Sequence, residues 1–230
     1  MPCINVIIPA YNEEQSIAQV VAAIPAGLVA DIIVVNNNSS DQTAKVASAA
    51  GATVLHEPTP GYGNACLCGI AYATAKPEEE RPDIIVFLDG DFSDHPEEMP
   101  LLLAPILAGK ADMVIGSRAL GNREAGAMMP QQIFGNWLAT TLMRWFYGVT
   151  YTDLGPFRAI RTDALLALNM RDRTYGWTVE MQVKAAKKRV PYTEVPVTYR
   201  KRIGLSKVSG TVKGSVMAGY KIILTIFKYL

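Results

Sequence analysis

The feature that most constrains the fold is the alternation of two hydrophobic patterns over the first half of the sequence. Short apolar runs rich in β-branched residues predict strands, and segments with apolar residues at helical spacing separate them. Strands that alternate with helices predict an α/β protein with a Rossmann-like, mostly parallel sheet flanked by helices. The predicted strands are 5–9, 31–35, 53–55, 84–88 and 113–115, and the predicted helices are 13–24, 41–50, 64–75 and 97–107.

The pattern changes after residue 121, where helices become longer and strands fewer. The 230 residues contain no internal repeat and no clear interdomain linker. We therefore expect one main domain over residues 1–210, followed by a C-terminal amphipathic helix within 211–230. In this second part the predicted helices are 131–147, 178–188 and 216–230, and the predicted strand is 195–199.

Charge is distributed very unevenly, although the net charge is only +1. Residues 181–230 carry eleven Lys or Arg and one acid, which gives 11 − 1 = +10. Residues 1–180 carry eleven Lys or Arg and twenty acids, which gives 11 − 20 = −9. Two interpretations are open: a solvated basic surface, or a surface that meets phosphates or anionic lipid headgroups. We expect no nucleic-acid partner.

The compartment can also be predicted from composition. The three cysteines lack the spacing of a metal site and are expected to pack as small apolar residues in a reducing cytosol. We identify neither a signal peptide nor a transmembrane segment. These features predict a cytoplasmic protein.

Parallel sheets bind ligands beyond the carboxyl ends of their strands, so the polar residues after each predicted strand are the candidate site. The strongest motif is Asp89-Gly90-Asp91, which directly follows the run 84–88. Two carboxylates that flank a glycine can converge on one hard divalent cation, and a diphosphate can supply the remaining oxygen ligands. The motif therefore predicts Mg²⁺ or Mn²⁺ bound by Asp89 and Asp91. A turn with solvated acids is the alternative.

Two more polar segments follow the first and second predicted strands. Pro-Ala-Tyr-Asn-Glu-Glu occupies 9–14, and Asn-Asn-Asn-Ser-Ser-Asp occupies 36–41. Asn side chains can hydrogen-bond a nucleobase edge, although helix caps and ordinary turns use the same residues. A third segment, Gly-Tyr-Gly-Asn at 61–64, lacks the last glycine of a dinucleotide fingerprint and is better interpreted as a closely packed helix start.

Together, these segments resemble glycosyltransferase family 2 in residue type and order. The series continues with Gly-Ser-Arg at 116–118, Asp-Leu-Gly-Pro-Phe-Arg at 153–158, Glu-Val-Pro at 194–196 and Arg-Ile-Gly-Leu-Ser-Lys at 202–207. The later segments are most similar to the polyprenyl-phosphate sugar transferases, the dolichol-phosphate branch. The resemblance implies a GT-A fold and inverting transfer of a hexose from a UDP- or GDP-sugar to a lipid-linked phosphate, with Mg²⁺ or Mn²⁺ as cofactor.

The resemblance also implies roles for individual residues. A nucleoside pocket, a diphosphate and metal site, and a set of phosphate-binding cations are expected, the last suited to the fork of arginine. The nucleoside set is Pro9, Tyr11, Glu13 and Asn37, the diphosphate and metal set is Asp89, Gly90 and Asp91, and the cationic set is Arg118, Arg202 and Lys207.

The acceptor class decides whether a catalytic base is needed. A phosphate oxygen is already anionic at neutral pH, whereas a hydroxyl acceptor requires a positioned carboxylate. Asp153 and Glu180 are the candidate bases for a hydroxyl acceptor; a turn acid and a helix-start acid are the alternatives. Two other classes remain open, a sugar nucleotidyltransferase and a non-catalytic sugar-nucleotide sensor. The former favours a Gly-rich basic loop where this chain has Pro9-Ala10-Tyr11.

Three departures from the family pattern limit what the resemblance implies. Asn36 and Asn37 stand where many relatives have an acidic pair, which leaves the base of the nucleotide open. Ser93 stands where some members of the polyprenyl branch place a longer metal ligand, so the third ligand is undetermined. Many members of that branch also continue into transmembrane helices, whereas this sequence stops at Leu230.

The last segment, 216–230, is apolar and carries Lys221 and Lys228 seven residues apart, on nearly one helical face. An interfacial helix that holds the protein on a membrane surface would have this pattern. Packing on the main domain or on another subunit would give the same pattern.

Overall fold

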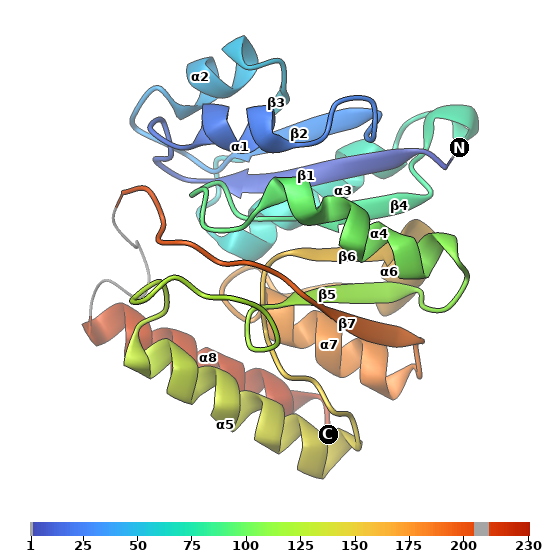
Figure 1. Ribbon diagram of the computed structural model, residues 1–230, viewed down its shortest axis with the longest axis vertical. Helices are drawn as coiled ribbons and strands as arrows, with labels where there is room; N and C mark the ends of the chain where they lie inside the picture. The colour runs from blue at the N-terminus through green and yellow to red at the C-terminus, as the bar shows by residue number, and fades with distance from the viewer. Residues whose placement is uncertain (1, 205–211) are drawn as a thin grey trace.

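The computed structural model describes residues 2–204 and 212–230, and side chains in the second range from residue 217 onward. A seven-stranded sheet in the order β3-β2-β1-β4-β6-β5-β7 lies between two layers of helices (Figure 1). The strands are β1 (Ile4–Ala10), β2 (Asp31–Asn36), β3 (Thr53–His56), β4 (Ile84–Phe87), β5 (Met113–Ser117), β6 (Arg158–Arg161) and β7 (Tyr192–Pro196).

Eight α-helices occur in the described part of the chain. Two 3₁₀ turns, Glu78–Glu80 and Pro96–Glu98, precede β4 and α4. The α-helices are α1 (Ile17–Ala23), α2 (Thr43–Ala49), α3 (Tyr62–Thr74), α4 (Met99–Leu107), α5 (Pro130–Tyr147), α6 (Thr162–Leu168), α7 (Trp177–Lys187) and α8 (Val212–Lys228).

The strands are parallel except for β6, which is antiparallel to both of its neighbours. Arg158 begins β6 and pairs with Phe87 near the end of β4 and with Ile115 in β5. Because β6 runs against its neighbours, the segment just before it lies at the carboxyl ends of the other strands. The topology thus brings residues 153–157 to the edge of the sheet where polar residues were predicted to gather.

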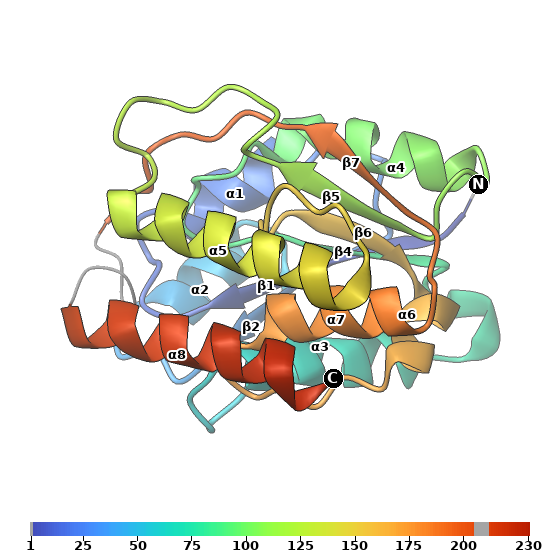
Figure 2. The same ribbon diagram turned by 90° about the horizontal axis from the view of Figure 1, so that it is seen from below.

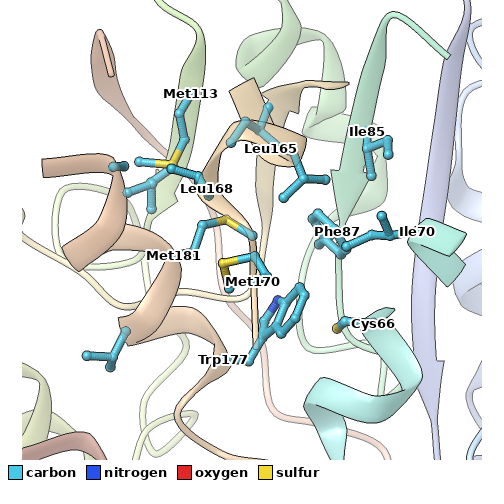
Figure 3. Packing of buried hydrophobic residues seen from close by; sticks show 14 of the residues in the cluster. Cys66, Ile70, Ile85, Phe87, Met113, Leu165, Leu168, Met170, Trp177 and Met181 are labelled. Atoms are coloured by element: carbon cyan, nitrogen blue, oxygen red, sulfur yellow. The ribbon is translucent and has the colours of Figure 1, made fainter. Parts of the chain in front are cut away.

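The core has two halves, one on each face of the sheet, as the alternation of side chains along a strand requires. In β1, Ile7 contacts the half formed with α3, α5 and α7, whereas Val6 and Ile8 contact the half formed with α1 and α4. Phe87 and Trp177 meet edge to face with ring centroids 6.1 Å apart, which ties α7 to the centre of the sheet (Figure 3).

The predicted α/β fold is confirmed, with three local differences. The late strand lies at Tyr192–Pro196 rather than at 195–199, because it pairs with β5 three residues earlier than predicted. The sequence analysis identified neither β6 nor α6 as a separate element. The predicted helix 13–24 begins only at Ile17, because residues 13–16 form a turn in which Ser16 donates to the carbonyl oxygen of Glu13.

The C-terminal helix α8 is part of the core. It lies beside α5 and α7 (Figure 2), and its Ile226 is fully buried. The Tyr147 hydroxyl in α5 donates to the carbonyl oxygen of Ile226, and Lys221 in α8 forms an ion pair of 2.9 Å with Asp172. Within residues 2–204 and 212–230, no helix is long and apolar enough to cross a membrane.

Candidate active site

A pocket of about 600 Å³ opens at the carboxyl edge of the sheet. Its walls come from the loops after β1, β2 and β4 on one side and from α5 and α8 on the other. Such a volume is typical of small-molecule sites. The residues predicted from sequence that line it are Pro9, Tyr11, Glu13, Asn37, Asp89, Gly90, Asp91, Arg118 and Arg202.

The loop after β1 is fixed by the loop after β2. The backbone N–H of Ser40 donates to the Asn12 side chain at 2.8 Å, and the backbone N–H of Glu13 donates to the Thr43 hydroxyl at 2.8 Å. Asn12 adopts a left-handed backbone, which Asn tolerates better than most residues. The Tyr11 ring is half exposed at the pocket wall. The polar residues after these two strands therefore form one rigid wall.

The structure gives Asn37 a role that the sequence did not reveal. Its side-chain N–H groups donate to the carbonyl oxygens of Glu57 and Thr59 at 3.0 and 2.8 Å. Its side-chain oxygen accepts from the backbone N–H of Gly61 at 2.7 Å. Both donors of the amide are thus used to hold the 57–61 loop, which also lines the pocket. Asn37 shapes this side of the pocket rather than presenting free N–H groups to a ligand.

Three aspartates converge behind the end of β4. Burial first, and then the charge of Asp91, raises the pKa of Asp89 to about 7. Burial and the charges of Asp89 and Asp91 also raise the pKa of Asp94 well above its ordinary value. Asp94 was not predicted as a site residue. Its position three residues after the Asp-Gly-Asp motif, next to Ser93, is the signal that could have identified it.

This aspartate cluster suits a cation. Asp89 Oδ1 and Asp94 Oδ1 are buried and have no hydrogen-bond partner among the described residues. Unpartnered buried carboxylate oxygens are costly unless a positive charge neutralises them. No group of three or more His, Cys, Asp or Glu side chains is arranged to hold a metal by itself within the described part of the chain. Asp89 therefore fits a metal ion that takes its other ligands from a bound diphosphate or from water, and Asp91 can become a second ligand once Arg202 releases its Oδ2.

Arg202 crosses over this cluster from the segment after β7. Its Nη2 lies 3.1 Å from Asp91 Oδ2 and 3.2 Å from Glu13 Oε1. The backbone N–H of Ile203 donates to the carbonyl oxygen of Asp91 at 2.9 Å. A guanidinium thus reaches the place where the phosphates of a donor are expected. Lys207, the third predicted cation, lies outside the described residues.

Arg118 and Asp153 form a buried bidentate ion pair. Arg118 Nε and Nη2 donate to the two carboxylate oxygens of Asp153 at 2.8 Å each, and the backbone N–H of Arg118 donates at 2.8 Å. Burial alone would raise the pKa of Asp153, but the charge and hydrogen bonds of Arg118 hold it below its ordinary value. Arg118 lines the pocket, and its guanidinium stacks on the Tyr199 ring at 4.9 Å. The carboxylate of Asp153 holds Arg118 from behind.

Glu180 lies away from the pocket. Its carboxylate is fully buried and accepts from the backbone N–H of Asp172 at 2.7 Å and from the Tyr229 hydroxyl at 2.6 Å. It also pairs with Lys184 at 2.7 Å. This placement corrects the prediction of Glu180 as a base, because its oxygens are occupied by donors that join α7, α8 and the 171–172 loop. Asp153 as a base is corrected on similar grounds, since its carboxylate is committed to Arg118.

The other wall of the pocket was not predicted. The helices themselves were expected, but helical periodicity does not show which residues face a ligand. Asn136 in α5 bonds both the carbonyl oxygen of Thr152 and the backbone N–H of Leu154, which fixes α5 to the segment before β6. The lining residues on these helices are Gln131, Gln132, Gly135 and Asn136 in α5, and Ala218, Gly219 and Ile222 in α8.

Comparisons with known proteins agree with this geometry. The sequence model of glycosyl transferase family 2 matches residues 5–168. An uncharacterized glycosyltransferase of Mycobacterium tuberculosis is 39% identical over 223 residues, which cover 94% of each chain. An undecaprenyl-phosphate mannosyltransferase of Micrococcus luteus is 31% identical over 226 residues, which cover 92% of this chain and 89% of the relative.

A solved structure with a similar fold is glucosyl-3-phosphoglycerate synthase from Mycobacterium tuberculosis, in complex with Mn²⁺, UDP-glucose and phosphoglyceric acid. The TM-score is 0.76 at 23% identity, and the match covers 99% of this chain and 79% of that chain. At this identity the likeness shows the fold. With the family match over most of the sequence and the Asp-Gly-Asp motif at the end of β4, the chain belongs to glycosyl transferase family 2 and has the GT-A fold.

Proposed function

We propose that this glycosyltransferase moves a hexose from a UDP- or GDP-sugar to a polyprenyl phosphate, with inversion at the anomeric carbon. Asp89 and Asp91 would hold Mg²⁺ or Mn²⁺, which neutralises negative charge on the departing diphosphate. The relative from Micrococcus luteus, an undecaprenyl-phosphate mannosyltransferase, supports the acceptor. The synthase solved with Mn²⁺ and UDP-glucose supports the metal and a uridine donor.

The observation that carries the acceptor proposal is the distribution of charge along the pocket. The carboxylates among its described lining residues are Glu13, Asp89 and Asp91, all on the strand-end wall. The lining residues of α5 and α8 include none. A hydroxyl acceptor on that side would have no base beside it, whereas a phosphate oxygen needs none. Arg118, held in a fixed orientation by Asp153, offers a matching cation.

In this proposal, each part of the pocket has a separate role. The rigid wall made by the loops after β1 and β2 binds and orients the nucleoside, so that the sugar lies in front of the aspartate cluster. Arg202, which contacts Asp91 and Glu13, can exchange these carboxylates for donor phosphate oxygens. Arg118 orients the acceptor phosphate for in-line attack on the anomeric carbon.

We further propose that the enzyme binds to a membrane surface through the outer faces of α5 and α8. Several large apolar side chains on α5 are exposed, among them Phe134, Trp137 and Trp145, the last at 74%. Phe146 in α5 and Phe227 in α8 are both partly exposed and meet edge to face at 5.2 Å, which joins the two surfaces. Aromatic side chains are enriched at membrane interfaces. Arg144 in α5 and Lys228 in α8 are exposed and would add attraction to anionic lipids.

A direct test uses the full chain with a panel of UDP- and GDP-hexoses labelled in the sugar. Undecaprenyl phosphate, undecaprenol and 3-phosphoglycerate are offered in separate reactions, each with Mn²⁺, Mg²⁺ or a chelator. Of the three acceptors, we expect only undecaprenyl phosphate to give a metal-dependent product in the organic phase. The labelled sugar should stay in the organic phase after treatment with alkaline phosphatase. Product formed from undecaprenol or from 3-phosphoglycerate, with none from the lipid phosphate, would refute the proposed acceptor.

A further inference from the structure

Two glycines on the helical wall of the pocket have no structural reason to be glycine. Gly135 lies in the interior of α5 and Gly219 in the interior of α8, and neither has a left-handed backbone. A Cβ atom at either position would meet no described atom within 4 Å. A glycine in a helix interior costs about 1 kcal/mol relative to alanine. Each helix therefore loses stability at this position without a packing need inside the protein.

Other glycines of the chain show what a packing need is. A Cβ at Gly121 would overlap the backbone of Val197, and a Cβ at Gly63 would overlap the backbone at Asp172. These positions are fixed by neighbours in the folded chain. Gly135 and Gly219 instead face the pocket, both of them partly buried. The space that their missing side chains leave belongs to the pocket.

Among its described residues, the wall around the two glycines carries no charge: it is apolar on α8, and on α5 the amide side chains of Gln131, Gln132 and Asn136 flank Gly135. Ala218 and Ile222 in α8 line the same part of the pocket wall, and Leu154 and Met128 line the pocket as well. Leu154 and Met128 are each only 9% exposed. No described lining residue of α5 or α8 carries a charge. The α8 side of the wall, with Leu154 and Met128, suits a hydrocarbon group rather than a phosphate.

The wall also connects two other parts of the molecule. Arg118 lines the pocket, and the outer faces of α5 and α8 carry the exposed aromatic surface. Because Arg118 and the helical wall line one pocket, an acceptor phosphate at Arg118 would place an attached chain along α5 and α8. A lipid acceptor would thus remain close to the membrane while its phosphate is inside the pocket.

We propose that Gly135 and Gly219 keep open a groove for the hydrocarbon chain next to the acceptor phosphate, and so determine that the acceptor is an isoprenoid phosphate. This proposal rests on the function proposed above, and it assigns the acceptor chain to a specific place. A side chain larger than methyl at either position would fill the groove without disturbing the nucleoside wall or the aspartate cluster.

The test is a size series at each glycine, made in the full chain: Gly135→Ala, Gly135→Leu, Gly219→Ala and Gly219→Leu. KM is measured for undecaprenyl phosphate and for dimethylallyl phosphate, which carries one isoprene unit, in the same detergent. We expect each Leu variant to raise KM for undecaprenyl phosphate by about tenfold or more, the scale of a misfit in an apolar pocket. KM for dimethylallyl phosphate should rise less, and the Ala variants should stay within about twofold for both acceptors.

Two further measurements separate the possible failures. Nucleoside diphosphate affinity should be unchanged in all four variants, because the substitutions add atoms only to open space on the helical wall. The midpoint of thermal unfolding should not fall, and in the Ala variants it should rise by about 2–4 °C, because each removes the cost of a glycine in a helix interior. Leu variants that leave KM for undecaprenyl phosphate unchanged would overturn the groove while the proposed function stands. A wild-type enzyme that glycosylates neither phosphate would overturn the proposed function and the groove with it. An equal rise in KM for undecaprenyl phosphate and for dimethylallyl phosphate would also overturn the groove, since the effect would not depend on the length of the hydrocarbon chain.

Discussion

The two walls of the pocket are built in different ways. The strand-end wall consists of loops that are joined to one another by hydrogen bonds between side chain and backbone, such as Asn12 to Ser40 and Asn37 to Gly61. The helical wall consists of regular faces of α5 and α8 with small or uncharged lining residues. The first wall carries the carboxylates of the pocket, and in the proposed function it fixes the positions of the reacting groups. The second wall sets the shape of the space that remains.

Under the proposed function, the strand-end wall governs the chemistry and the helical wall governs the choice of acceptor. A substitution on the strand-end wall alters the position of a carboxylate or a phosphate, and catalysis depends steeply on such positions. A substitution on the helical wall alters volume and apolar surface, which changes binding by smaller factors. Variants of the two walls should therefore differ in both the size and the kind of their effects.

The largest effect is expected at the aspartate cluster. Asp91→Ala should lower turnover by roughly 10²-fold or more, because it removes a major electrostatic element of the site. The measurement is kcat with saturating donor and acceptor in Mn²⁺. Asp112→Ala is the matched control, since the Asp112 side chain is 42% exposed and its ion pair with Arg161 is long, at 3.9 Å. Full activity of Asp91→Ala in excess chelator would show that this cluster is not the metal site.

The Arg118–Asp153 pair should give the next largest effect, because it joins the strand-end chemistry to the acceptor side. Asp153→Asn keeps the shape but leaves Arg118 buried without a full counter-charge, at an expected cost of about 3 kcal/mol in the free energy of unfolding. We expect kcat/KM for the acceptor to fall by about tenfold or more, since a bidentate contact is lost.

Urea unfolding and acceptor kinetics together test this expectation. Glu124→Gln serves as the control, because the Glu124 side chain pairs with Lys201 at the surface and should be replaceable. If Asp153→Asn retained both wild-type stability and wild-type acceptor kinetics, the inferred role of Asp153 in holding Arg118 would be wrong.

The two walls also differ in how well they could be predicted from the sequence. The gathering of polar residues at one edge of the sheet was largely predictable, because Asp89 and Asp91 follow a buried apolar run and parallel strands end at one edge. The antiparallel strand β6 was missed, because it is four residues long and its partners are remote in sequence. The helical wall was missed for a similar reason. Which face of α5 meets α8 depends on tertiary packing, which leaves no local pattern around Gly135 or Gly219.

Glu180 should show a structural rather than a catalytic effect. Burial raises its pKa, but hydrogen bonds from Lys184, Tyr229 and the backbone outweigh burial and lower the pKa below its ordinary value of 4.5. The native state therefore binds fewer protons than the unfolded state near that pH, and the stabilisation is present above 4.5 and lost as pH falls through the folded pKa. Glu180→Gln should lower the free energy of unfolding at pH 7 by about 2 kcal/mol.

Thermal unfolding at several pH values measures this effect. The midpoint of thermal unfolding should be roughly 4–8 °C lower in Glu180→Gln than in the wild type at pH 7. This difference should narrow as the pH falls below 4.5 and the Glu180 carboxylate becomes protonated in the folded protein. Activity with undecaprenyl phosphate at low temperature should stay within about threefold of wild type, because no proton has to be removed from the acceptor. A variant as stable as wild type but inactive would restore Glu180 as a candidate base.

The smallest effect is expected on the outside of the helical wall, where the membrane surface is proposed to bind. Because α8 is part of the core, its deletion would disturb the fold, and exposed side chains give a cleaner test. Trp137 and Trp145 in α5 are 58% and 74% exposed. Partial burial of each ring among lipid headgroups is worth about 1 kcal/mol, so each Trp→Ser change should weaken binding to anionic vesicles about fivefold. Leu166→Ser in α6 removes a large apolar side chain of similar exposure, 53%, away from α5 and α8, and is the control.

Co-sedimentation with anionic vesicles at low and high salt then separates the contribution of the aromatic rings from that of the basic residues. Salt should weaken wild type and variants alike, because it screens the basic residues. Trp variants that bind vesicles as tightly as wild type would place any membrane contact on another face of the protein.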